Sequence, residues 1–262
     1  MTMPQLPDDW DVTRTTLQAY THALTAIPRA GGTPDDRWTH VAMKIVPNGL
    51  RTAPTPLVDG SDLVATLDLD SHEIVVEAGD DTERIDMKAG PAPATVGVAL
   101  LAFAARHGSM IDADGERFSD TDTQIYVPDH ASAFLGTAVF VAEAFSEMNE
   151  SVQGEVTGPH LWPHGFDIAT EWFSSERMPY GDSDASAQIA VGWYPAGDGY
   201  FYANPWPFND SWAETPVLEG TSWHLDGWQG AVLDSAGVER AKVVAFGKAV
   251  HSLAREALAG AG

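Results

Sequence analysis

The chain has 262 residues, of which 44% are hydrophobic, and its 38 acidic and 14 basic side chains give a formal net charge of −24. So acidic a surface repels phosphate backbones, which argues against nucleic acids as partners. The absence of cysteine excludes disulfides, thiolate catalysis and cysteine-ligated zinc.

The composition of the charged residues is also unusual, since aspartate outnumbers glutamate and only four of the basic residues are lysine. This pattern is typical of proteins that stay hydrated in high salt, although a GC-rich genome with an acidic proteome gives the same composition.

The start of the chain lacks the basic and apolar segments of a signal peptide. The most apolar stretch, residues 95–105, is shorter than the ~20 residues needed to cross a bilayer. We therefore expect a cytoplasmic, salt-tolerant protein with no membrane partner.

The first half of the chain opens with an amphipathic helix over residues 11–28, in which Leu17, Tyr20 and Leu24 recur at helical spacing. A strand over residues 38–46 follows, and alternation of side chains along it predicts that His40 and Lys44 share one face. The remaining elements of this half are predicted over residues 63–69, 73–77 and 83–88 (strands), 95–107 (a buried helix) and 124–127 (a strand).

The second half repeats this order. Its elements are predicted over residues 131–148 (a helix), 160–173 (a strand), 188–194 and 200–204 (a hairpin), 223–233 (a strand) and 238–258 (a helix). Helices segregated from antiparallel strands indicate the α+β class. We expect residues 1–262 to form one compact domain, with an internal duplication that relates about residues 11–127 to residues 131–260.

Histidines in the two long predicted strands suggest a shared site. Alternation places His160, Trp162 and His164 on one face of the second strand, as it places His40 and Lys44 on one face of the first. If the halves face each other, these groups line one pocket.

Within that pocket, His160 or His164 is the candidate general base, and Lys44 or Arg51 is the candidate group to hold an anionic substrate. Asp167 is expected to orient one imidazole. The structural alternative is a surface strand with long, solvated basic side chains.

His160, His164 and Asp167 are also the candidate ligands of a metal ion. Four residues of strand separate the two imidazoles by about 13 Å, too far to bind one ion unless the chain bends at Pro163. With such a bend, the set would suit zinc or non-haem iron. The sequence favours hydrogen-bonded histidines over a metal site and leaves any cofactor unknown.

Tryptophan is concentrated in the second half, where seven of the nine lie after residue 160. Trp162 and Trp172 share a strand face, and Trp193 follows in the next hairpin. Aromatic faces suit flat ligands and sugars, but they suit an ordinary core equally well. The sequence therefore predicts a His- and Trp-lined pocket for a small molecule, with a carbohydrate- or protein-binding module or a metal-dependent enzyme as alternatives. It does not decide whether the protein is an enzyme.

Several motifs occur in an order that resembles a prokaryotic family known as domain of unknown function 5996. They are Trp38 with His40, Gly49–Thr52, Asp70 with His72, His160–Ala169, Gly192–Pro195, Tyr200–Tyr202 and Pro205–Pro207. The resemblance extends from about residue 10 to residue 230 and implies a single family domain. It implies no activity and no role for any residue.

Overall fold

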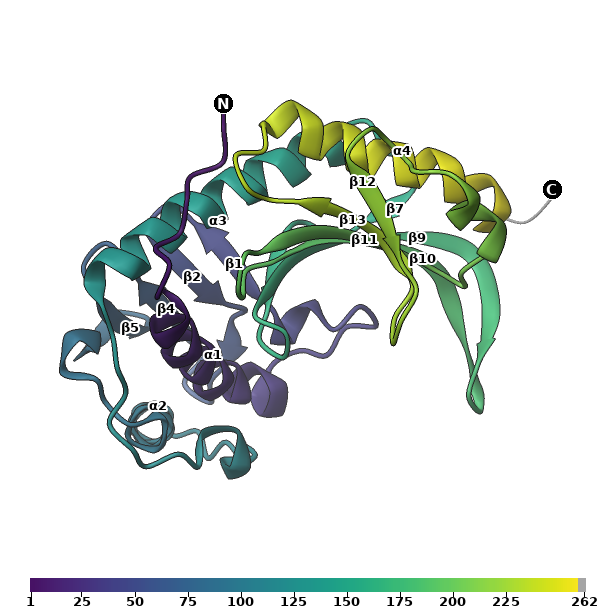
Figure 1. Ribbon diagram of the computed structural model, residues 1–262. Helices are drawn as coiled ribbons and strands as arrows, with labels where there is room; N and C mark the ends of the chain where they lie inside the picture. Colours follow the sequence, from purple (N-terminus) through teal and green to yellow (C-terminus); the bar gives the residue numbers. More distant parts are fainter. Residues whose placement is uncertain (259–262) are drawn as a thin grey trace. The chain divides into compact units, whose positions relative to one another are not determined.

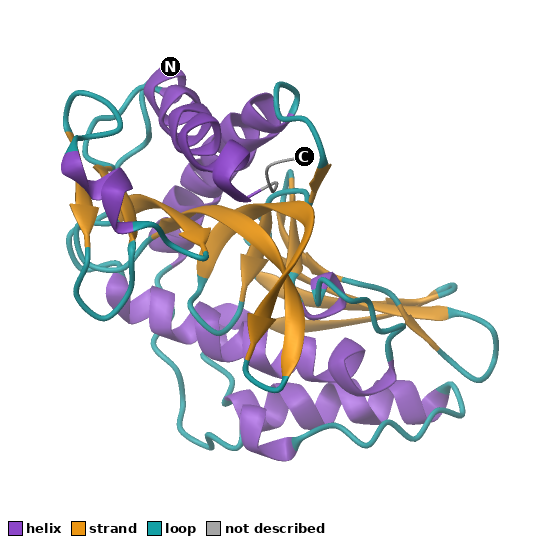
Figure 2. Ribbon diagram, turned by 90° about the vertical axis from the view of Figure 1, so that its right-hand side faces the viewer, coloured by secondary structure: helices purple, strands orange, loops and turns teal. Residues whose placement is uncertain are grey.

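The computed structural model of the protein describes residues 1–258. Within them are thirteen strands, all paired antiparallel, and four α-helices: α1 (Asp11–Gly31), α2 (Pro93–Arg106), α3 (Pro128–Asn149) and α4 (Arg240–Leu258). The combination of four α-helices with an entirely antiparallel set of strands (Figure 2) confirms the predicted α+β class.

The described chain forms two compact units. The N-terminal unit contains Leu6–Val139 and His160–Phe166. The C-terminal unit contains Met1–Gln5, Phe140–Pro159 and the chain from Asp167 to the last described residue. A single domain with an internal duplication stays a prediction.

The N-terminal unit is built on one antiparallel sheet. In spatial order its strands are β8 (His160–Trp162), β1 (Met43–Val46), β2 (Gly49–Thr52), β4 (Asp62–Asp68), β5 (Glu73–Ala78) and β6 (Asp81–Asp86), and β3 (Thr55–Pro56) pairs with β4. Helix α1 contacts β2 and β3 and lies alongside these strands in Figure 1. Met43, Leu50 and Leu67 are fully buried, so one face of the sheet forms the core of this unit.

The main strands of the C-terminal unit are also antiparallel neighbours in a sheet. Their order is β12 (Thr221–His224), β13 (Gly230–Asp234), β11 (Tyr200–Trp206), β10 (Ser183–Tyr194) and β9 (Asp167–Tyr180), and β7 (Glu155–Val156) pairs with β9. Phe145 of α3 packs edge-to-face on Phe201 of β11, with ring centroids 6.1 Å apart. A Cβ atom on Gly247 of α4 would lie 2.1 Å from the Met148 sulfur, so the two helices meet closely over this face.

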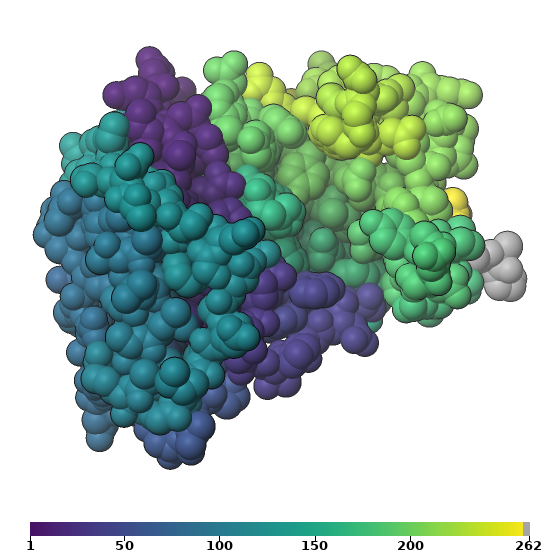
Figure 3. Space-filling view, turned by 90° about the horizontal axis from the view of Figure 1, so that it is seen from below, coloured from purple at the N-terminus to yellow at the C-terminus, as the bar shows by residue number. Residues whose placement is uncertain are grey.

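An arm projects from the C-terminal unit, where the β9–β10 hairpin continues beyond its neighbour. Strand β11 pairs with β10 only from Gln188 onward, and residues 176–186 pair only within the hairpin. Its tip stands out as a green lobe in Figure 3. The polar sequence of residues 174–187 hides this extension, because no apolar alternation marks it.

The predicted strand over residues 38–46 begins only at Met43. Trp38 adopts a left-handed conformation with φ 59°, and Thr39–Val41 form a short 3₁₀ helix. The Asp35 carboxylate stabilises this turn by accepting the backbone N–H groups of Thr39 and His40. The prediction that His40 shares a strand face with Lys44 was therefore wrong.

The predicted strand over residues 160–173 is interrupted by a tight turn. Strand β8 ends at Trp162, β9 begins at Asp167, and the Phe166 N–H donates to the Trp162 carbonyl at 2.8 Å. Pro163, which has no N–H to donate to a ladder, and Phe166, with φ 54°, belong to this turn. His164 therefore lies in the turn and not on the strand that carries His160 and Trp162.

Two further strand predictions fail locally. Residues 124–127 form no strand, and residues 223–233 form two strands joined by a turn over residues 225–229. Helix α1 also runs three residues past its predicted end, through Pro28 to Gly31.

Helix α3 is the one described helix long and apolar enough to span a membrane. Of its most apolar window, 56% is buried inside the protein. Burial of this kind is typical of a core helix, and Phe134, Val141 and Phe145 are among its fully buried side chains.

His251 of α4 is a buried titratable group in the core of the C-terminal unit. The edge of its ring packs against Trp172 with centroids 5.3 Å apart, and its Nε2 has no hydrogen-bond partner among the described residues. Burial, with the nearby positive charge of Arg255, lowers the pKa of His251 below 6.5.

Stability is therefore expected to fall as the pH drops below about 6.5, because the unfolded chain binds a proton that the folded His251 resists. Urea unfolding between about pH 5 and pH 7.5 measures this slope, and His251→Gln should flatten it.

His107→Gln is the control, because it is expected to change the pH dependence of stability in the opposite direction. Its ring lies 2.7 Å from Asp59, and hydrogen bonding to that carboxylate raises the pKa of His107. His107 therefore adds stability at acidic pH that is lost as the pH rises through its folded pKa, so its removal should steepen the slope. An unchanged slope in His251→Gln would contradict the assignment.

Candidate functional site

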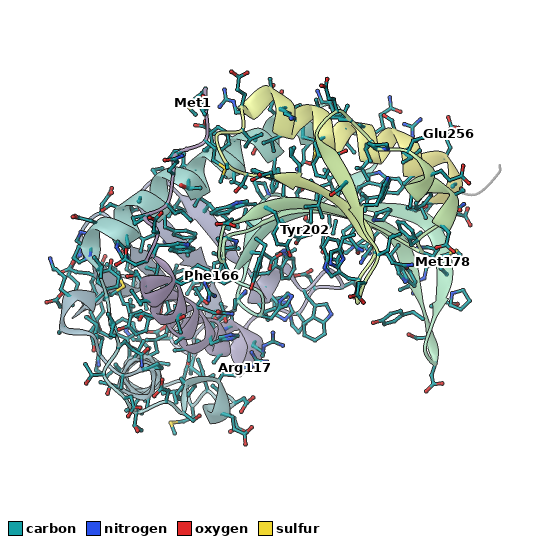
Figure 4. All side chains as sticks on the ribbon, viewed as in Figure 1. Met1, Arg117, Phe166, Met178, Tyr202 and Glu256 are labelled. Carbon is teal, nitrogen blue, oxygen red and sulfur yellow. The ribbon has the colours of Figure 1, made fainter. Side chains whose placement is uncertain are left out.

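The open face of the C-terminal sheet carries a row of aromatic and polar side chains. Because Phe201 faces α3, alternation along the strand points Tyr200 and Tyr202 to the opposite side, away from the helices. Tyr202 is labelled in Figure 4. Strand pairing sets Asp234 opposite Tyr200 and Val232 opposite Tyr202. The face that the helices leave open is thus polar and aromatic.

A groove of about 500 Å³ lies at the β12–β13–β11 side of this unit. It is lined by Asp198, Gly199, Tyr200, Gly220, Thr221, Ser222, His224, Trp228, Val232 and Asp234. Its volume lies in the range of sites for small organic molecules.

Stacked rings form one wall of the groove. The His224 and Trp228 rings are nearly parallel, at 14°, with centroids 4.4 Å apart, and the Tyr200 ring is parallel to Trp228 within 10° at 6.5 Å. His224 Nδ1 lies 3.0 Å from the Trp228 carbonyl oxygen. Since a carbonyl only accepts, this bond assigns the hydrogen to Nδ1 and leaves Nε2 of the neutral ring as an acceptor.

The charged residues that line the groove are both acidic. Asp198 and Asp234 contribute carboxylates, and no lysine or arginine is among its lining residues. The Asp234 side chain is oriented by the backbone N–H of Ala236, which donates to its Oδ1 at 2.9 Å. The lining therefore favours a positively charged or neutral hydroxylated ligand over an anion.

A tyrosine–carboxylate pair lies on the same open face. The Tyr202 hydroxyl donates a hydrogen bond to the buried Asp167 carboxylate. Burial raises the pKa of Tyr202, and the negative charge of Asp167 raises it further, so the hydroxyl stays a donor. The Tyr202 ring packs over Gly192, where a Cβ atom would lie 2.2 Å from the ring. Sequence analysis found Asp167 but not this partner.

Three of the predicted site residues come together in the N-terminal unit. Lys44 of β1 lies directly opposite His160 of β8 and, on its other side, opposite Arg51 of β2. Directly opposed residues of antiparallel strands point to the same face. The structure thus brings Lys44, His160 and Arg51 side by side.

The other predicted residues of the N-terminal unit lie outside this row. His40 is buried in the 3₁₀ turn, where its ring stacks on Trp38 at 5.6 Å and its Nδ1 is 3.4 Å from Asp35. His164 is exposed in the turn after β8, and its ring approaches that of Trp162 at 6.3 Å.

Trp193 lies in the core of the C-terminal unit and not in the groove. It is paired with Phe201, so its side chain points to the face covered by α3, and it is almost fully buried. Core packing was the alternative that the sequence analysis gave for the tryptophans.

No group of three or more histidine, aspartate or glutamate side chains in residues 1–258 is placed to hold a metal ion. Of the candidate ligands, His160 and His164 belong to the N-terminal unit and Asp167 to the C-terminal unit. Neither unit by itself supports the metal hypothesis.

Sequence analysis missed the groove because it predicted one strand over residues 223–233. The Asp226-Gly227 pair in the middle of that range is a strong hairpin signal. A hairpin there would have placed His224 and Trp228 at the two sides of a turn.

A model described as "Family of unknown function (DUF5996)" matches residues 3–245 of the chain. The chain therefore belongs to this family, as the resemblance of its motifs predicted. No curated protein and no solved structure matches it.

Proposed function

We propose that this member of the family binds a small positively charged molecule, an amine or a quaternary ammonium compound, in the groove of the C-terminal unit. One observation carries the proposal: the groove combines a stacked Trp228–His224 wall with two aspartates and has no lysine or arginine among its lining residues.

The chemistry of this combination selects for cations. An ammonium group over an aromatic face gains about 0.5–2 kcal/mol from the ring quadrupole. Asp234 and Asp198 add Coulomb attraction to a cation and repel an anion. Nε2 of His224 and the hydroxyl of Ser222 are the polar groups available to orient such a ligand. The general-base roles assigned to His160 and His164 stay predictions.

Calorimetric titration with tetramethylammonium and with spermidine tests the proposal. We expect saturable binding, weakened about tenfold or more by Trp228→Ala and by Asp234→Asn. Asp226→Asn is the matched control: it removes the same charge from an exposed position two residues from Trp228, outside the lining, and should leave binding unchanged.

A carbohydrate is the second candidate ligand, because Ser222, on the open face of the sheet, lies in the same lining as Trp228. Titration with neutral oligosaccharides separates the two. Sugar binding without ammonium binding would replace the cation proposal by the carbohydrate one. Binding of neither class would refute both.

A further inference from the structure

The N-terminal unit carries a row of three basic side chains across neighbouring strands, His160 of β8, Lys44 of β1 and Arg51 of β2, here called the basic row. Adjacent strands lie about 4.8 Å apart, so the row spans about 10 Å. Its charge is opposite in sign to that of the groove in the C-terminal unit.

The basic row lies on the sheet face opposite to the one that carries Met43 and Leu161. Met43 and Leu161, which alternate with Lys44 and His160, are fully buried. Lys44 is exposed, and the Arg51 side chain is 46% exposed. The charged ends are therefore accessible from solvent.

The charges of Lys44 and Arg51 are poorly compensated. Like charges directly opposite on neighbouring strands destabilise a sheet. No carboxylate of the described residues forms an ion pair with Lys44, and the nearest to Arg51 is Glu77, at 3.8 Å. In a chain with 38 acidic and only 14 lysine and arginine residues, this arrangement is unexpected for a solvated surface alone.

Trp162 supplies an independent observation. It lies two residues from His160 on the same strand, so the two side chains share a face. Trp162 is only 9% exposed, and its indole Nε1 has no hydrogen-bond partner among the described residues. A buried N–H donor without an acceptor is rare and points to an acceptor supplied by a ligand.

From these observations we infer that the basic row and Trp162 form a binding site for a small molecule bearing carboxylate or phosphate groups. Arg51 and Lys44 bind its oxygen atoms by charge-assisted hydrogen bonds, and the Trp162 N–H donates to a further oxygen. This anion site is independent of the cation-binding groove, and either can exist without the other.

Titration with succinate and with inorganic phosphate tests the inference, followed by the indole N–H signals in ¹H–¹⁵N NMR spectra. Trp162→Phe identifies the Trp162 signal by its loss. We expect this signal to shift saturably, with a dissociation constant on the order of 1 mM. A response to only one of the two probes assigns the site to carboxylate or to phosphate.

Lys44→Gln and Arg51→Gln should each weaken binding about tenfold or more. Arg84→Gln is the matched control, because register places Arg84 on the same face of the sheet beyond Arg51, where it is already paired with Glu73 at 2.7 Å. Equal weakening by all three variants would show a general charge effect and overturn the inference. A Trp162 signal that does not move, or binding that does not saturate at tenfold higher probe concentration, would also overturn the inference. Urea unfolding midpoints serve to show that the variants are folded.

Discussion

Replacing Gly49 by alanine is expected to destabilise the protein by about 4 kcal/mol, near the upper end of single-substitution effects. Gly49 begins β2 and pairs with Asp68 of β4. A Cβ atom there would lie 1.8 Å from the Leu67 carbonyl oxygen and 2.9 Å from its carbonyl carbon. Both are backbone atoms, so no side-chain rotation relieves the overlap, and β2 and β4 must separate.

Urea unfolding measures this effect, with Gly136→Ala as the control. Gly136 is exposed within α3, and beyond the backbone of its own helix no atom lies within 4 Å of the position that an added methyl group would take. The same substitution should there stabilise the protein by about 0.5–1 kcal/mol, because alanine is the better helix former. A Gly49→Ala midpoint equal to that of the wild type would show that the strands pair differently.

Trp10→Ala is expected to cost about 3–5 kcal/mol by leaving a large cavity in the N-terminal unit. Trp10 immediately precedes α1 and is only 2% exposed. Its ring stacks on Phe134 of α3 at 5.4 Å, and Phe134 stacks in turn on Phe166, at 5.3 Å. This three-ring stack joins the start of α1, the helix α3 and the turn after β8.

Trp38→Ala is the control for ring removal, since Trp38 is 56% exposed. It stacks on His40 and on the guanidinium of Arg29 at the surface, so its loss should cost less than about 1 kcal/mol. Thermal or urea unfolding of both variants gives the comparison. Similar losses for Trp10→Ala and Trp38→Ala would contradict the stack as a stabilising core.

Side-chain periodicity was enough to predict the class and most of the elements. Leu17, Tyr20 and Leu24 recur at helical spacing because one face of α1 is buried, and all three are fully buried. The strands β4 and β5 were predicted over residues 63–69 and 73–77, because turn-forming residues separate two apolar alternations there.

The failures arise where the backbone departs from regular geometry. Trp38 and Phe166 adopt positive φ angles that bulky residues rarely occupy, and each begins or ends an irregular turn. Neither angle follows from residue type, because tertiary packing imposes it. For this reason His40 and His164 were placed on strands that the chain does not form.

Only part of each candidate site could be predicted, because tertiary structure decides which residues come together. His160 and Lys44 were singled out by alternation, which holds within β8 and β1. Their direct opposition depends on strand register, which a single sequence does not reveal. The groove depends on the pairing of β11, β13 and β12, so its residues lie scattered over residues 198–234.

The way the chain is divided between the units limits how it can be shortened. The N-terminal unit takes its strand β8 from residues 160–166, after the chain has already contributed 140–159 to the other unit. A fragment ending at residue 139 would therefore keep β1 and β2 but lose β8, the strand on the other side of β1. Its unpaired edge at Met43 and Lys44 would be open to association with other chains. No single truncation point can isolate either unit whole.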